Sequence, residues 1–110
     1  MENNRIASSD AQMKKGVLEM CVLHMIRNEP TYGYDIMKSI GRHFPEVNES
    51  TIYAILRRLY ADGCASCTTN AESGGPPRKY YQITPEGAAL LDATAAAWRR
   101  INVVLNEMGL

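Results

Sequence analysis

The residues of this sequence best suited to recognise another molecule lie in one stretch, from Asn48 to Gly63. Short and hydroxylated side chains come first, and arginines follow about two helical turns later. Small side chains let a backbone approach DNA closely, while hydroxyl and guanidinium groups can bond phosphates and base edges. The stretch therefore has the chemistry of a helix that enters the major groove. Its candidate contacts are Ser50, Thr51, Tyr53 and Arg57, whereas the adjacent Arg58 points about 100° away and either flanks the contact or is a solvated surface charge.

The same stretch has the pattern of a helix that can position those groups. Asn48 is placed to cap its start, and Gly63 stands where the left-handed residue after a helix usually lies. Apolar residues recur at i, i+3, i+4 and i+7, which predicts one face docked in a core. These apolar residues are Ile52, Ile55, Leu56 and Leu59. Because ordinary surface helices share this pattern, the neighbouring segments must decide between recognition and a solvated face.

Composition narrows the class of protein. The chain has 110 residues, 12 basic and 12 acidic, with a formal net charge of zero. This length predicts one domain. The absence of a long apolar run or a signal peptide pattern predicts no membrane span and a cytoplasmic location. Three cysteines are too few and too odd in number for a disulfide scaffold. Zero net charge counts mildly against nucleic acid, so local basic clusters must supply the attraction.

Two helices are expected before the recognition stretch. Residues 1–10 are predicted to form a flexible arm, and residues 11–28 a helix that is apolar nearly all round. Pro30 ends that helix, and Thr31 is placed to cap a second one up to about residue 44. The second helix is joined to the recognition stretch by a short linker. Two short helices connected in this way, the later one polar at its start, predict a helix-turn-helix.

After Gly63 the pattern changes to that of a β-hairpin. Residues 65–69 and 79–83 are predicted as strands, and the Gly- and Pro-rich segment between them as a loop. Arg78 and Lys79 lie where this loop ends, so they are predicted to reach a phosphate or the minor groove. Three helices followed by such a hairpin predict a winged helix, here assigned to residues 11–84.

A last helix is expected over residues 85–110, with Thr84 as its cap and Pro85 at its first position. Its apolar residues follow a heptad, and the first helix has more apolar faces than one small domain can cover. Both features predict a homodimer built by these two helices. The predicted interface contains Val17, Met20, His24, Leu91, Trp98, Ile101, Leu105 and Met108.

Trp98 is the candidate for binding a small molecule. It follows three alanines, and such small neighbours around one large ring can leave space where two copies meet. A flat aromatic or apolar effector can then stack between two tryptophans. The alternative is that Trp98 only fills the dimer core. Met13, Val17 and Met20 are candidate lining residues, although Met at helical spacing is more often ordinary core.

Metal, redox and catalytic chemistry have little support. Cys64 and Cys67 have C-x-x-C spacing, but residues three apart on a strand point to opposite faces. Buried or incidental thiols are therefore expected rather than a zinc site or a thiol switch. The Gly-Gly pair precedes Pro-Pro and not a helix, so it is no phosphate loop. We expect no metal, no cofactor and no enzymatic activity.

Three segments together resemble the PadR family of bacterial transcriptional regulators. They run from residue 18 to 40, 50 to 63 and 73 to 91, and include Tyr-Gly-Tyr, Thr-Ile-Tyr…Leu-Arg-Arg-Leu and Gly-Gly-Pro-Pro-Arg-Lys-Tyr-Tyr…Thr-Pro-Glu-Gly. The single C-terminal helix resembles the compact subgroup that includes small multidrug-sensing repressors. The resemblance implies a homodimeric repressor that leaves its operator when a small molecule binds.

The same resemblance implies roles for individual residues. Tyr34 lies at the family's phosphate-contacting tyrosine, and Trp98 where multidrug-sensing members place an aromatic at the dimer centre. Cys64 departs from the family, because a branched aliphatic is usual there.

The sequence thus predicts a mainly α protein with a small β-hairpin, that is, a winged helix-turn-helix with a C-terminal dimerisation helix. The predicted partners are double-stranded DNA with a pseudo-palindromic operator, a second copy of the chain, and a small aromatic or apolar effector. The competing interpretation is a winged-helix module that binds protein and not DNA, which the zero net charge favours.

Overall fold

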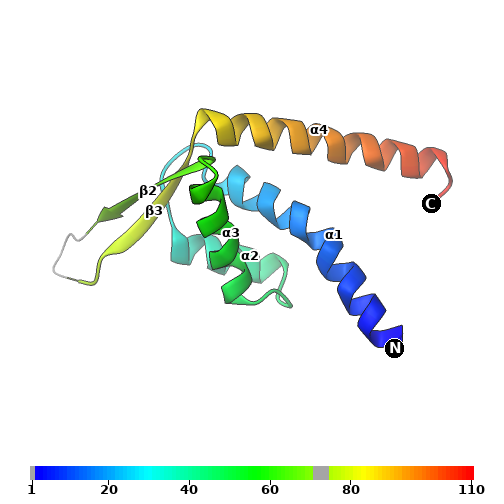
Figure 1. The fold of residues 1–110 in the computed structure, drawn as a ribbon, viewed down its shortest axis with the longest axis horizontal. Coiled ribbons are helices and arrows are strands. Elements are labelled where there is room, and N and C mark those ends of the chain that lie inside the picture. The colour runs from blue at the N-terminus through cyan, green and yellow to red at the C-terminus, as the bar shows by residue number, and fades with distance from the viewer. Residues whose placement is uncertain (1, 71–74) are drawn as a thin grey trace.

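The computed structural model describes residues 2–70 and 75–110. Helices α1, α2 and α3 form a compact group, the hairpin projects from one side of it, and α4 runs across it and beyond (Figure 1). The elements in chain order are α1 (Glu2–Met25), β1 (Thr31–Tyr32), α2 (Gly33–His43), α3 (Glu49–Ala61), β2 (Ala65–Asn70), β3 (Arg78–Ile83) and α4 (Pro85–Glu107).

The sheet ties the hairpin to the helices. Its strand order is β1-β3-β2, and both pairings are antiparallel. The predicted hairpin is confirmed, with Cys67 opposite Tyr81. Strand β1 was not predicted. It pairs with the other edge of β3, where Thr31 lies opposite Tyr81. The tip of the predicted loop, residues 71–74, lies outside the described residues.

The core lies where the three helices meet the hairpin. All four apolar residues predicted for the inner face of α3 are buried, with at most 3% of their surface exposed. Fourteen hydrophobic residues are buried in the described structure. They are Leu18, Val22, Leu23, Ile26, Ile36, Ile40, Ile52, Ile55, Leu56, Leu59, Cys64, Ala65, Tyr81 and Leu91.

The N-terminal segment differs from its prediction. The expected flexible arm is helical, because α1 already begins at Glu2, and α1 ends at Met25 instead of near Asn28. No Gly or Pro interrupts residues 2–10, and Asp10 forms an i,i+4 ion pair with Lys14 at 2.6 Å. Residues 4–10 are all exposed, so this part of the helix contributes no core.

Two predicted caps are wrong in detail. The Asn48 side chain makes no cap hydrogen bond, although its backbone carbonyl accepts one from the Thr51 N–H at 3.1 Å. The Thr31 hydroxyl donates to the carbonyls of Met25 and Glu29, because Thr31 belongs to β1 and not to the start of α2. Gly63 does have the predicted left-handed conformation, with φ +77°.

The start of α4 is attached to the turn between α3 and β2. The Thr84 hydroxyl accepts a hydrogen bond from the Gly87 N–H at 3.1 Å and donates one to the Gly63 carbonyl at 2.6 Å. The Thr84 N–H donates to the Cys64 carbonyl at 3.2 Å. The predicted cap is thus confirmed, and it also sets the direction in which α4 leaves the domain.

The folded chain is more elongated than a compact domain with the same number of residues. Its radius of gyration is 16.0 Å, and its dimensions are 56 × 34 × 23 Å. A compact domain of this length has a radius of gyration of about 13 Å. The excess comes from the N-terminal half of α1, the C-terminal half of α4 and the strands β2 and β3, all of which extend away from the core (Figure 1).

Candidate nucleic-acid interface

The hairpin of β2 and β3 is the wing of the predicted winged helix. A hollow of about 320 Å³ lies between the start of α2, the outer face of α3 and the base of this wing. Four of the residues predicted to contact DNA line it, although they are far apart in the sequence. They are Tyr34, Tyr53, Arg57 and Lys79. Three elements therefore place phenol, guanidinium and ammonium groups around one concave surface.

The outward side of α3 is divided between two surfaces. Tyr53 and Arg57 line the hollow beside the wing, whereas Thr51 and Arg58 line another hollow beside α1. Arg58 pairs with Glu19 of α1 at 3.7 Å. Adjacent helical residues differ in direction by about 100°, which separates the two arginines. Ser50 is exposed at the start of α3. It precedes Tyr53 by three residues and Arg57 by seven, so it lies on the same face of the helix as these two.

Tyrosine rings and cations extend this surface toward the wing. The Tyr32 ring lies 6.0 Å from that of Tyr34 and 5.6 Å from that of Tyr80. Lys38 Nζ is 5.6 Å from the centre of the Tyr34 ring, and Arg78 Cζ is 5.3 Å from that of Tyr32. These distances suit cation–π contacts, which orient the basic groups.

The contributions of Tyr32, Lys38 and Tyr80 were missed in the sequence. The i,i+4 spacing of Tyr34 and Lys38 was a readable signal, because such residues are neighbours on a helix. The pairing of Tyr32 with Tyr80 had no such signal, since β1 has only two residues.

Tyr81 forms the floor of the hollow. Its side chain is buried, and burial together with the neighbouring Cys67 raises the pKa of the Tyr81 hydroxyl. The phenol therefore stays protonated and adds no negative charge below Arg57. A Cβ atom at Gly33 would lie 3.4 Å from Cε2 of this ring, which is ordinary van der Waals contact, so the start of α2 packs directly beside the floor.

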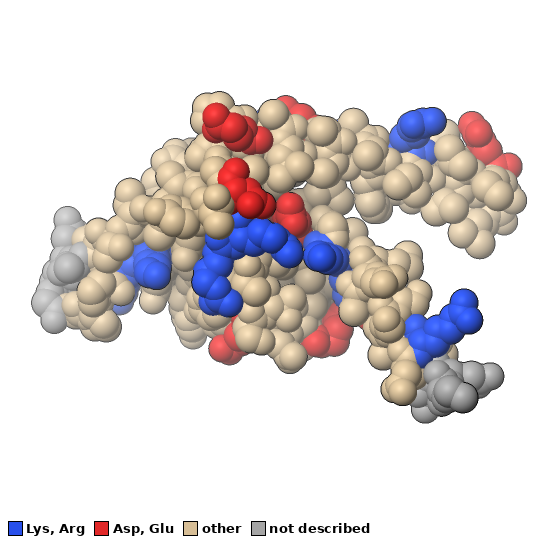
Figure 2. Space-filling model, viewed as in Figure 1, with Lys and Arg blue, Asp and Glu red and all other residues tan. Residues whose placement is uncertain are grey.

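Charge is distributed unevenly despite the zero total. Figure 2 shows basic side chains gathered over the helices and at the base of the wing, with acidic side chains between α3 and α4. In this view the basic side chains over the helices adjoin acidic ones, whereas those at the base of the wing have no acidic side chain beside them. Local attraction for an anion is compatible with a net charge of zero.

The cysteines lie apart from this chemistry. Cys64 is buried before β2, and burial raises the pKa of its thiol, which therefore stays protonated. Cys67 is half-buried on β2. Among residues 2–70 and 75–110, no three His, Cys, Asp or Glu side chains are grouped so as to hold a metal ion.

The residues predicted for dimer and effector contact lie mainly on the extended parts of α1 and α4. Trp98 is 49% exposed, Ile101 56%, Met108 77% and Met13 76%. Leu91 is an exception, because it is buried in the core of its own chain and so has no free surface for a partner. Met20 also packs partly against that core, whereas His24 is exposed and Val17 and Leu105 are partly exposed.

Neither α1 nor α4, nor any other helix in the described part of the chain, is long and apolar enough to cross a membrane. A three-helix core, a two-stranded wing and a recognition helix beside that wing define a winged helix-turn-helix protein.

Comparison with known proteins agrees with this class. The model of the transcriptional regulator PadR-like family matches residues 22–93. A PadR-like transcriptional regulator from Bacillus cereus is 38% identical, with a TM-score of 0.76 over 88% of this chain and 95% of that one. A PadR family regulator from Eggerthella lenta is 30% identical, with a TM-score of 0.81 over 97% of this chain and 94% of that one.

A curated relative supports the same assignment. The transcriptional regulator Rv3488 of Mycobacterium tuberculosis is 28% identical over 80 residues, which cover 73% of this chain and 74% of that protein. The chain belongs to the PadR-like family of transcriptional regulators. The members of this family are transcriptional regulators and not enzymes, so the expectation that this chain is no enzyme is confirmed.

Proposed function

We propose that this regulator binds a pseudo-palindromic operator as a homodimer, and that it is a repressor released by a small apolar or aromatic ligand. The observation that carries the DNA site is the convergence of Tyr34, Tyr53, Arg57 and Lys79 on one concave surface. In this arrangement α3 enters the major groove, and the wing lies along the neighbouring backbone.

The roles of the contact residues follow from their places on this surface. Ser50, Tyr53 and Arg57 lie on one stripe of α3, so they approach the same groove. Arg57 is the residue with the reach and the donors to read a guanine. Tyr34 and Lys79 flank it and are assigned to phosphates, which set the register of the protein on DNA. Arg78 is assigned to the wing contact, and Thr51 lies at the edge of the α3 contact.

The proposed dimer rests on the apolar surface of α1 and α4. Both helices extend beyond the core and expose large hydrophobic side chains, which a second copy of the chain can cover. A two-fold pairing through these helices would place two copies of α3 on one side of the DNA, about 34 Å apart if they read successive turns. The exposed side chains are Met13, Trp98, Ile101, Val104 and Met108.

The direct test is selection of bound sequences from a random duplex DNA pool at low and at moderate salt. We expect enrichment of an inverted repeat with half-sites about one turn apart, because each protomer reads one half. Affinity for that repeat should fall steeply as salt rises, since bound cations release counterions from DNA. A folded dimer that enriches no sequence at either salt would contradict the proposal and favour the protein-docking module.

A second test concerns Trp98, the proposed centre of dimer and effector contact. Trp98→Ala should raise the dissociation constant of the dimer by about tenfold or more, because an aromatic interface residue often contributes over 1.4 kcal/mol. Analytical ultracentrifugation measures this constant. Arg99→Ala, a change at the neighbouring exposed cation, is the control and should leave the dimer intact. Equal dimer stability of the wild type and Trp98→Ala would remove Trp98 from the interface.

A further inference from the structure

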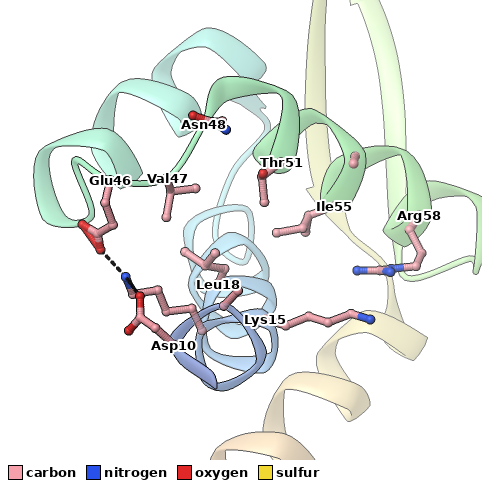
Figure 3. A pocket seen from close by; sticks show the side chains of 12 residues that line it. Asp10, Lys15, Leu18, Glu46, Val47, Asn48, Thr51, Ile55 and Arg58 are labelled. Carbon is pink, nitrogen blue, oxygen red and sulfur yellow. Dashed lines mark hydrogen bonds and ion pairs between the residues drawn. The ribbon is translucent and has the colours of Figure 1, made fainter. Parts of the chain in front are cut away.

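A second hollow, of about 440 Å³, lies between the middle of α1, the loop before α3 and the side of α3 away from the wing (Figure 3). Its apolar floor includes Leu18 and Ile55, which are 2% and 3% exposed, together with Val47. The volume falls within the range of small-molecule pockets, which is about 300–1,000 Å³. An apolar floor with polar groups at the rim suits an amphipathic ligand.

This hollow is separate from the proposed dimer surface. On α1 it is lined by residues spaced as one helical stripe, which are Asp10, Ala11, Lys14, Lys15 and Leu18. Met13 and Val17 fall on another side of that helix, at about 100° per residue. A second copy that packs on Met13 and Val17 would therefore leave this opening accessible.

Only one side of the rim favours an anion. On the other side Lys14 Nζ lies 2.6 Å from Asp10 and 2.5 Å from Glu46, so two carboxylates surround one ammonium and leave a net negative charge there. Lys15 has no ion-pair partner within the described part of the chain, and Arg58 holds only Glu19, at 3.7 Å. In Figure 3 the cationic ends of Lys15 and Arg58 lie on the same side of the hollow. With Glu19 counted, this side of the hollow keeps one net positive charge, which attracts a negatively charged group.

The hollow also touches the recognition helix. Thr51, Ala54 and Arg58 of α3 line it, while Tyr53 and Arg57 of the same turns face the wing. The pair between Arg58 and Glu19 joins α3 to α1, and a ligand anion at Arg58 would compete with Glu19. Occupancy can therefore change how α3 is held against α1, which carries the proposed dimer surface.

We propose that this hollow binds a small amphipathic organic anion, with its apolar body on Leu18, Val47 and Ile55 and its negative group at Lys15 and Arg58. The bound anion changes the position of α3 relative to α1, and this change alters the affinity of the protein for DNA. The binding site stands on the geometry of the hollow, whereas its regulatory effect rests on the proposed function. Linkage requires that DNA change the affinity for the anion by the same factor.

The binding is tested with two fluorescent probes of nearly the same aromatic body. One is 1-anilinonaphthalene-8-sulfonate, and the other is N-phenyl-1-naphthylamine, which lacks the sulfonate. The folded dimer should bind the sulfonate probe about tenfold more tightly, because charge-assisted hydrogen bonds to two cations are lost with the neutral probe. Equal affinity for the two probes would overturn the assignment of an anion.

Variants locate the site. Lys15→Gln and Arg58→Gln should each weaken binding of the sulfonate probe by about fivefold, and together by more, if each supplies one charge-assisted bond. Arg42→Gln removes an exposed cation of α2 that does not line the hollow, and it should have no effect. Thermal melts confirm that each variant is folded. Loss of probe binding in Trp98→Ala alone, with Lys15→Gln unchanged, would place the probe at the tryptophan and overturn the site.

The regulatory effect is tested by anisotropy of labelled operator DNA from the selection experiment. Saturating sulfonate probe should change operator affinity by at least about fivefold, the lower end of usual coupling between sites. The Lys15→Gln/Arg58→Gln variant should show no such change. Unchanged operator affinity in the wild type would overturn the regulatory effect. If no operator is selected although the probe maps to this hollow, the proposed function fails and the binding site stands.

Discussion

Replacing Arg57 with alanine is expected to weaken operator binding by about 10- to 100-fold, because one bidentate arginine–guanine contact contributes about 1–3 kcal/mol. Arg57 lines the α3–wing hollow, is exposed to solvent and packs in no core. The variant should therefore keep the thermal stability and the dimer of the wild type. Fluorescence anisotropy with the selected operator, at one fixed salt concentration, measures the change.

The neighbouring arginine is a matched control for this prediction. Arg58 has the same side chain on the same turn, but it lies on the α1 side and pairs with Glu19. Arg58→Ala should change the affinity for ligand-free operator by less than about threefold, in line with the small energy of an exposed ion pair. Equal losses in the two variants would show that α3 lies on DNA differently from the arrangement proposed here.

The second large effect is expected at Gly87, on stability and not on binding. A Cβ atom at this position would lie 2.0 Å from the Cys64 carbonyl oxygen and 2.8 Å from Ile83 Cγ1. The oxygen belongs to the backbone of the turn before β2, so the clash cannot be relieved by a side-chain rotation. Gly87→Ala should cost about 3 kcal/mol or more and lower the melting temperature by more than about 10 °C.

Gly41 supplies the control for this substitution. It also lies within a helix. A Cβ atom there would have no atom within 4 Å apart from those of the adjacent residues and the nearby backbone of its own helix. Gly41→Ala should raise the free energy of unfolding by about 0.5–1 kcal/mol, because alanine costs less backbone entropy than glycine in a helix. Calorimetry or circular dichroism melts compare the two variants. A Gly87→Ala protein as stable as the wild type would show that α4 can shift away from Cys64 at little cost.

Much of the fold could be predicted because local patterns and tertiary packing agree. The stripe of α3 from Ile52 to Leu59 is buried as its spacing predicts, and the cap at Thr84 and the turn at Gly63 have the expected geometry. Errors occurred where nothing local favoured one outcome. Residues 2–10 carry mostly polar side chains that suit either an arm or an exposed helix, and α1 includes them.

Individual residues of the candidate site could be predicted from the sequence, but their arrangement could not. Tyr34, Tyr53, Arg57 and Lys79 were each readable as polar contacts, since their types and positions suit phosphate or base recognition. That they share one hollow depends on how α2, α3 and the wing pack. The strand β1 is part of this packing, and its two residues are too few to show a period.

The sequence alone determined the order of the elements, the buried face of α3 and the chemical types available for recognition, because each depends on neighbours within a few residues. Only the tertiary structure decided that Arg57 faces the wing while Arg58 faces α1, and that a second hollow lies behind the recognition helix. It also decided that Gly87 must pass within van der Waals reach of Cys64. These features depend on distances between segments far apart in the chain, which no local spacing encodes.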